Sequence, residues 1–220
     1  MLDKNKIYRY LGYNPNTNIL TNDIIEMVDE GIEEINKIAT CKCVFSQILP
    51  VNIKKTLYAG NLELNGDDIQ KHLENCTNAL FMAVTLGVPI DNLIRKYEAV
   101  NMAKAIVIDT ICNILIDDIA DEYENKYRDK LKQENLYLTS RFSPGYGDLS
   151  INLQKNIISI LDANRKIGLT VSDSGLLIPK KSITAILGIA SIPVKGKLAG
   201  CKNCLLKEKC AFRKRGQTCY

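Results

Sequence analysis

Apolar and polar residues alternate with a helical period in three stretches of the chain. The first, residues 22–39, follows Thr21, a residue type that commonly caps helices. The second begins at Asp67 and is expected to end near Gly87, because glycine and a nearby proline stop helices. The third covers residues 91–133 and predicts one long helix. The apolar positions of the second stretch are Ile69, Leu73, Cys76 and Leu80.

The third stretch has two contrasting faces. Apolar residues three or four positions apart form one face, which is expected to be buried. The opposite face is acidic, and we interpret it as a helix surface that faces solvent. The apolar face consists of Ile108, Ile111, Cys112, Leu115, Ile116, Ile119, Ala120, Tyr123 and Tyr127. The acidic face consists of Asp117, Asp118, Asp121, Glu122 and Glu124.

Short apolar or β-branched runs bounded by turn residues predict strands around these helices. From Leu136 a predicted short strand leads into a loop rich in glycine and proline, and Asp148 is expected to cap a further helix. Helices and strands mix without a regular βαβ alternation, so the predicted fold class is α+β with an antiparallel sheet. The other predicted strands are residues 44–49, 51–58, Gly168–Ser172, Gly175–Ile178 and Ile183–Ile189.

The composition fits one large domain with an appendage. The chain has 220 residues, of which 46% are apolar, enough for a core that needs no disulfide or metal. Its net charge of +4 is uneven: residues 180–220 hold ten basic residues and one acid, whereas residues 1–179 hold 19 basic and 24 acidic residues. Because Pro193 and two later glycines resemble a linker, we expect an acidic body over residues 1–195 and a basic tail over residues 196–220.

Several classes of protein are excluded by what the sequence lacks. The first residues have no apolar signal-peptide region, and the apolar stretch at residues 183–194 is too short to span a bilayer. We therefore expect a cytoplasmic protein without membrane association, whose eight cysteines are thiols or metal ligands. The single histidine, His72, disfavours catalysis or metal binding by several histidines, and its context is typical of a surface or capping residue.

The candidate chemistry lies in the loop from Arg141 to Asp148, with the sequence RFSPGYGD. Gly145 and a second glycine permit backbone conformations that let a ligand approach closely. Arg141 carries a planar set of donors suited to a carboxylate or phosphate, and Tyr146, between the glycines, can present its ring outward. The alternative is a simple turn between a strand and a helix.

This loop, the helix after it and the run IGLTVSDSGLLIPKKSITAILGI resemble the activation (reactivation) domain of cobalamin-dependent methionine synthase. The resemblance covers residues 87–190, and the R-x-x-P-G-Y pattern of residues 141–146 is its most specific element. It implies an α+β fold with a twisted antiparallel sheet flanked by helices, in a free-standing form of the domain. Leu187 and Gly188 stand where a member of the family carries an aromatic pair.

The resemblance also implies a reaction and its participants. Such a domain reactivates a cobalamin-dependent methionine synthase, or a related corrinoid protein, by reductive methylation of cob(II)alamin with S-adenosylmethionine. The partner protein holds the cobalamin. The chain would then be a methyltransferase component in methionine biosynthesis.

The same analogy assigns roles to individual residues. Arg141 would bind the methionyl carboxylate, the loop backbone would cradle S-adenosylmethionine, and Tyr146 would approach the corrin as a catalytic residue. An acid shortly before the loop is a ligand in the family, and Glu134 occupies a similar place with a spacing one residue longer. The cofactor-binding residues implied in this way are Arg141, Ser143, Pro144, Gly145, Tyr146 and Glu134.

The tail adds a second candidate site. Its four cysteines follow the pattern C-x2-C-x5-C-x8-C, and four thiolates complete either a zinc site or an iron–sulfur cluster. The reductive role favours a 4Fe–4S cluster, because such clusters reach low potentials, whereas zinc would make the tail a structural clip. Basic residues around the cysteines suit an acidic electron donor such as a flavodoxin or ferredoxin. The predicted metal ligands are Cys201, Cys204, Cys210 and Cys219.

Two other functions remain open from the sequence. A zinc knuckle with a basic tail is typical of a nucleic-acid-binding module. Phe212 and Tyr220, the aromatic residues of the tail, are few for stacking on bases, which disfavours nucleic acid as a partner. Alternatively, the chain is a non-catalytic accessory subunit of a corrinoid protein, with no cofactor of its own.

Overall fold

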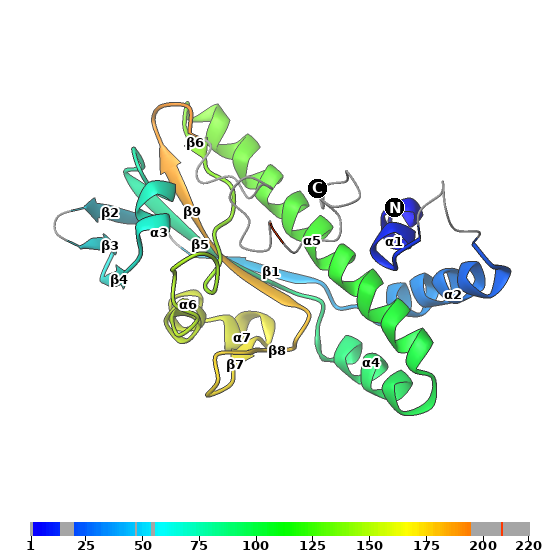
Figure 1. The fold of residues 1–220 in the computed structure, drawn as a ribbon. Helices are drawn as coiled ribbons and strands as arrows, with labels where there is room; N and C mark the ends of the chain where they lie inside the picture. The colour runs from blue at the N-terminus through cyan, green and yellow to red at the C-terminus, as the bar shows by residue number, and fades with distance from the viewer. Residues whose placement is uncertain (1, 14–19, 47, 54–55, 195–207, 209–220) are drawn as a thin grey trace.

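The computed structural model describes residues 2–13, 20–46, 48–53, 56–194 and 208 (Figure 1). The strands of its main sheet are β1 (Lys42–Phe45), β2 (Leu49–Ile53), β3 (Leu57–Ala59), β4 (Leu62–Leu64), β5 (Asn78–Thr85), β6 (Tyr137–Leu138) and β9 (Ser182–Ala190). They are antiparallel in the order β4-β3-β2-β5-β9-β6, and β1 also pairs with β5. The long strands β5 and β9 form the middle of the sheet, because they pair along the whole of β5.

Helices cover both faces of this sheet (Figure 1). They are α1 (Lys4–Tyr10), α2 (Asn22–Ile38), α3 (Asp67–His72), α4 (Val88–Val100), α5 (Met102–Gln133), α6 (Leu153–Leu161) and α7 (Ala163–Ile167). The long helix α5 crosses one face, with α1, α2 and α4 packed against it, whereas α6 and α7 lie on the other face. A small hairpin of β7 (Thr170–Val171) and β8 (Leu177–Ile178) contacts α6 and β9.

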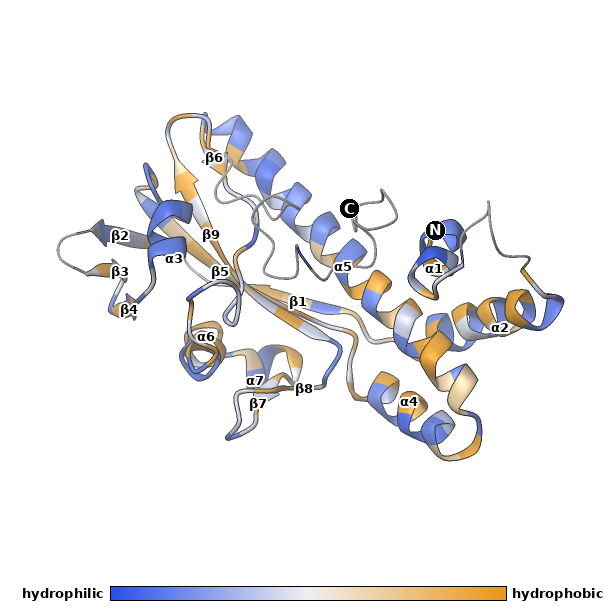
Figure 2. Ribbon diagram, in the orientation of Figure 1, coloured by the Kyte–Doolittle hydropathy of each residue, from blue (hydrophilic) through white to orange (hydrophobic). Residues whose placement is uncertain are grey.

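Two apolar cores result, one on each face of the sheet. Leu80, Met82 and Val84 of β5 pack into the core under α5. The residues between them, including Phe81, belong to the core under α6 and α7. Because both faces are covered, β5 is apolar from Ala79 to Val84 rather than alternating. Figure 2 shows these apolar strands, and it shows that the half of α5 next to β6 is mainly hydrophilic.

The predicted α+β class with an antiparallel sheet is confirmed. The helix expected at residues 22–39 is α2, and the strand expected at Ile183–Ile189 lies within β9. The two early strands have other bounds than expected, because β1 ends at Phe45 and β3 is separate from β2.

The helix predicted from Asp67 to Gly87 is wrong. Only α3 is helical, and the apolar residues after it form the central strand β5. Asn75 adopts a left-handed conformation (φ 65°) after α3, where the helical path ends. Gly87 and its neighbouring proline do not stop a helix but begin α4.

The single helix predicted over residues 91–133 is two helices. Asn101 is extended (φ −156°, ψ 90°) and separates α4 from α5. Its side-chain oxygen accepts a hydrogen bond from the backbone N–H of Lys104 at 3.1 Å, so Asn101 caps the N-terminus of α5. An asparagine at this position therefore ends one helix and starts the next.

Candidate functional site

The loop after β6 presents its central residues on a tight turn. The backbone N–H of Tyr146 donates to the carbonyl of Ser143 at 3.1 Å, with Pro144 and Gly145 between them. Gly145 has φ 91°, and proline followed by a glycine with positive φ is typical of a type II turn. Pro144 is buried and Gly145 is exposed, while the Tyr146 side chain is 61% exposed. The predicted outward position of Tyr146 is confirmed.

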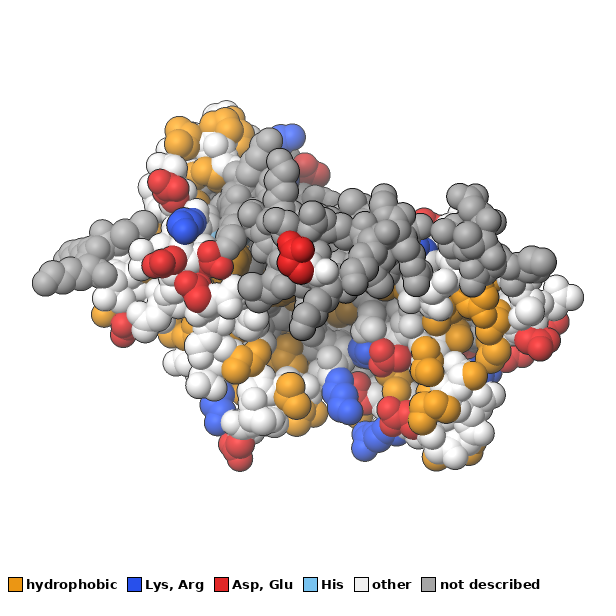
Figure 3. Space-filling view, in the orientation of Figure 1, with side chains coloured by type: hydrophobic (Ala, Val, Ile, Leu, Met, Phe, Trp, Pro, Cys, Tyr) orange, Lys and Arg blue, Asp and Glu red, His pale blue; other side chains and the backbone are white. Residues whose placement is uncertain are grey.

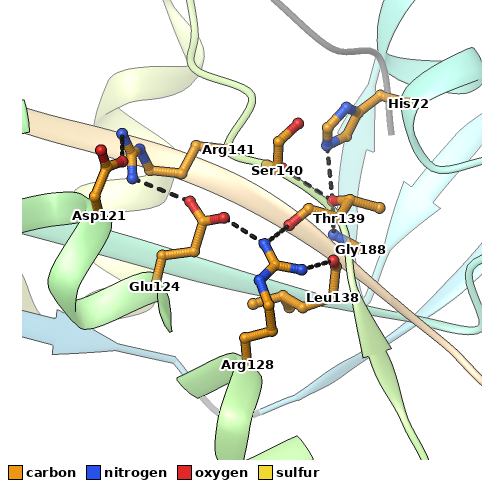
Figure 4. Close-up of polar contacts among 9 residues, drawn as sticks. All are labelled: His72, Asp121, Glu124, Arg128, Leu138, Thr139, Ser140, Arg141 and Gly188. Atoms are coloured by element: carbon orange, nitrogen blue, oxygen red, sulfur yellow. Dashed lines mark hydrogen bonds and ion pairs between the residues drawn. The ribbon is translucent and has the colours of Figure 1, made fainter. Parts of the chain in front are cut away.

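Arg141, at the start of the loop, is held by two carboxylates of α5 (Figure 4). Its Nη2 lies 2.7 Å from Oδ1 of Asp121, and its Nη1 lies 3.0 Å from Oε2 of Glu124. The Arg141 side chain is only 18% exposed. The guanidinium is therefore already neutralised within the chain by two acids of α5.

Glu124 also connects Arg141 to a second arginine (Figure 4). Its other oxygen, Oε1, pairs with Arg128 one helical turn later, and the Glu124 side chain is 11% exposed. Arg128 in turn donates to the backbone carbonyls of Leu138 and Thr139, which precede the loop. A buried carboxylate that joins two arginines fixes their positions, since losing it would leave both charges without this partner.

These contacts correct our interpretation of the acidic face of α5. It is not simply a solvated surface, because Glu124 is buried and Asp121 contacts the loop. The pairing of Glu124 with Arg128 is visible in the sequence, because the two residues are four positions apart on a helix. The sequence carries no signal, however, that joins either residue to Arg141 or Thr139.

The network continues through Thr139 to α3. The buried Thr139 hydroxyl accepts a hydrogen bond from the backbone N–H of Gly188 at 2.8 Å and lies 3.0 Å from Nε2 of His72. His72 is 1% exposed, and its ring stacks at a tilt 5.0 Å from that of Phe142. Our expectation of a surface or capping histidine is therefore wrong. Burial lowers the pKa of His72 to about 4, so its ring is neutral at pH 7.

The other end of the loop is held by the start of the same helix. The Asp148 carboxylate accepts hydrogen bonds from the backbone N–H groups of Asp67, at 2.6 Å, and Asp68, at 3.2 Å. Asp148 thus caps α3 and not, as expected, the helix that follows it, since α6 begins only at Leu153. A Cβ on Gly147 would lie 2.2 Å from the Asp68 carboxylate, so the loop and α3 touch closely.

Glu134 is not brought to this cluster. It is exposed and forms the C-terminal cap of α5, ten residues beyond Glu124. At a rise of 1.5 Å per residue, this separation corresponds to roughly 15 Å along the helix. The loop residues of the predicted site therefore lie together, and Glu134 lies apart from Arg141.

Gly188 has no room for a side chain. A Cβ there would lie 2.4 Å from Sγ of Cys76 and 2.9 Å from Cδ2 of Leu73. The space beside Gly188 is therefore filled by Leu73 and Cys76, which follow α3.

The described residues contain no group of three or more His, Cys, Asp or Glu side chains arranged to hold a metal ion. The predicted ligands Cys201, Cys204, Cys210 and Cys219 lie outside the described residues.

No helix in the described part of the chain combines the length and apolar character needed to cross a membrane. On the face shown in Figure 3, acidic side chains gather around α3.

Comparison with solved structures identifies the fold. The fold matches the structure titled "Crystal Structure of the MetH Reactivation Domain bound to AdoHcy" with a TM-score of 0.59 and 15% identity. The match covers 90% of this chain and 73% of that chain, so the two share an α+β fold. The comparison with curated protein sequences gave no match.

Comparison with protein families then identifies the particular family. Residues 61–191 match the family described as "Vitamin B12 dependent methionine synthase, activation domain". This range is more than half of the chain, and it contains β5, α5, the Arg141–Asp148 loop and β9. The chain therefore belongs to this activation-domain family, and the resemblance noted in its sequence is confirmed.

Proposed function

We propose that this chain reactivates a cobalamin-dependent methionine synthase, or a related corrinoid protein, by reductive methylation of its cobalamin with S-adenosylmethionine. The observation that carries the proposal is the family match over residues 61–191, which includes the R-x-x-P-G-Y loop. The fold match to a reactivation domain whose structure holds AdoHcy supports the same conclusion. AdoHcy is what S-adenosylmethionine becomes after it gives up its methyl group.

The proposed reaction suits the side chains available. One electron reduces cob(II)alamin to its cob(I) form, and the methyl group then passes from the sulfonium to cobalt. The C–S bond breaks, a Co–C bond forms, and S-adenosylhomocysteine leaves as a neutral thioether. No proton moves, so the chain needs no general base. Its task is to hold the methyl donor in line with a corrin that the partner supplies.

Within this proposal the loop residues take distinct roles. Arg141 binds the methionyl carboxylate, for which its planar donors are suited. The backbone of Ser143, Pro144 and Gly145 cradles the rest of the donor, because the type II turn exposes Gly145. Tyr146 faces outward and would meet the corrin as the catalytic residue. Glu134, the C-terminal cap of α5, lies apart from Arg141, so any contact it makes would be to another part of the donor.

We further propose that residues 1–195 form the activation domain and residues 196–220 a metal-binding tail. Cys201, Cys204, Cys210 and Cys219 would hold a 4Fe–4S cluster that passes the electron, or a zinc ion that folds the tail. The basic residues of the tail would receive an acidic flavodoxin or ferredoxin. Iron and zinc analysis of anaerobically prepared protein, with absorption near 400 nm, distinguishes the two metals.

The test is an anaerobic methylation assay with a cobalamin protein in its cob(II) state, a reductant and S-adenosylmethionine. We expect the cob(II) absorption to give way to that of methylcobalamin only when all components are present.

Arg141→Ala should weaken S-adenosylmethionine binding, measured by calorimetry, at least about tenfold, because a charge-assisted hydrogen bond is lost. The control is Arg165→Ala, which removes an exposed arginine of α7. Absence of any binding to the wild-type chain with its partner overturns the proposal.

A further inference from the structure

The two carboxylates on Arg141 differ in how firmly they are held. Glu124 is 11% exposed and shares its second oxygen with Arg128. Asp121 is 60% exposed and reaches Arg141 from the solvent side of α5. Asp121 occupies Nη2, a donor that a bound carboxylate could use, whereas Glu124 occupies Nη1 on the buried side of the guanidinium.

We propose that Asp121 competes with the ligand for Arg141, whereas Glu124 is a positioning residue that holds the guanidinium in place. This inference rests on the proposed function, in which Arg141 binds the carboxylate of S-adenosylmethionine. Asp121 pairs with Nη2 in the structure and swings into solvent when the ligand carboxylate takes its place. Glu124 stays on Nη1 in both states.

Burial decides which carboxylate gives way. If Glu124 left, Arg128 and the largely buried Arg141 would each lose a charged partner, which costs far more than breaking an exposed pair. Asp121 can leave at low cost, because its carboxylate is mostly hydrated already. Its release frees one side of the Arg141 fork while Glu124 still fixes the other side.

The competition makes an unusual prediction, namely that removing an acid strengthens the binding of a positively charged ligand. Asp121→Asn should lower the dissociation constant for S-adenosylmethionine about two- to fivefold, as expected for removal of one exposed ion pair. Glu124→Gln should raise the same constant at least about tenfold, because a buried charged hydrogen bond is lost. Calorimetry with the full chain, using S-adenosylmethionine and AdoHcy as probes, measures both changes.

A matched control distinguishes competition for Arg141 from the general effect of removing one negative charge from α5. Asp118 lies one turn before Asp121 on α5 and pairs with Lys6 at 2.8 Å. Asp118→Asn removes the same charge without touching Arg141, so it should not strengthen binding. Thermal unfolding of each variant shows whether it is folded, and the exposed Asp121 variant keeps the test valid even if Glu124→Gln does not fold.

The outcomes distinguish this inference from the proposed function. If the wild-type chain binds neither probe, the proposed function fails. If it binds and Arg141→Ala abolishes binding, but Asp121→Asn binds equally or more weakly, the competition is refuted. Weaker binding would instead assign Asp121 to the ammonium group of the ligand. A gain with Asp121→Asn and not with Asp118→Asn supports the inference.

Discussion

At the scale of single residues, the buried pair of Thr139 and His72 joins the loop to the rest of the fold. The Thr139 hydroxyl lies between His72 of α3 and the backbone of Gly188 in β9. His72 can remain there only as a neutral ring, since burial penalises the charged form and lowers its pKa to about 4. A hydrogen bond to the backbone of Ser140 opposes this shift without cancelling it.

We predict that this histidine makes the fold less stable in mild acid. In the unfolded chain His72 takes up a proton below its ordinary pKa of 6.5, whereas the folded chain stays neutral until about pH 4. The unfolded state therefore binds more protons, and stability falls as the pH is lowered through this window. The contribution of His72 between pH 7 and pH 5 is about 2 kcal/mol, measured by urea denaturation at each pH.

The control for this prediction is His72→Gln. Glutamine places a polar group near Thr139 but does not titrate, so this variant should lose clearly less stability between pH 7 and pH 5. Identical losses in the two proteins would show that other groups cause the pH dependence.

At the scale of elements, the short helix α3 braces both ends of the loop. Its last residue, His72, meets Thr139 just before the loop, and its first backbone N–H groups bind Asp148 just after Tyr146. Within the loop, the backbone N–H of Tyr146 donates to Ser143 and that of Leu149 donates to Tyr146, while Phe142 bridges to β9. Both ends of the loop are held by a helix that precedes it by about 70 residues in sequence.

Removing the Asp148 cap should loosen this brace. We expect Asp148→Ala to lower the free energy of unfolding by about 1–2 kcal/mol, because two backbone N–H groups of α3 lose their acceptor. Asp148→Asn keeps one acceptor oxygen and should cost less. Urea denaturation measures both changes.

An exposed acid elsewhere provides the comparison. Asp173 pairs with Lys155 at 3.3 Å on an exposed surface, so Asp173→Ala should change stability very little. A similar loss in the Asp148 and Asp173 variants would contradict a capping role.

The helices and strands also differ in how well the sequence alone predicts them. The helical period of α2 identifies it as a helix, and the β-branched residues of β9, bounded by turn residues, identify it as a strand. The helix predicted over β5 is wrong because this strand is buried on both faces, and an unbroken apolar run carries no two-residue alternation. Leu73, Cys76 and Leu80 then fit a helical stripe by coincidence.

The site was predictable where its residues are neighbours in sequence. Arg141, Gly145 and Tyr146 form one motif, and its type II turn follows from the Pro-Gly pair. Glu124 and His72 reach the motif from α5 and α3, and only the packing of the sheet brings these helices together. Long-range contacts of this kind leave no periodic signal in one sequence.

At the scale of the whole molecule, the described part of the chain buries two extensive apolar cores. The buried residues of the two described cores lie between Ile7 and Ala190, on the two faces of one sheet. The loop network also draws all its described partners from within this range. The body therefore has an apolar core of its own to drive folding, and under the proposed function the tail would fold around a metal.

We therefore predict that a chain ending at residue 195 folds and binds S-adenosylmethionine as the full chain does. Its melting temperature should shift by less than about 3 °C, the change that roughly 1 kcal/mol causes in a chain of this size. It should lose its bound iron or zinc and its reduction by a flavodoxin or ferredoxin. A large loss of stability or of S-adenosylmethionine affinity would mean that the tail belongs to the activation domain. Substituting Cys204 with serine in the full chain separates loss of metal from loss of the segment.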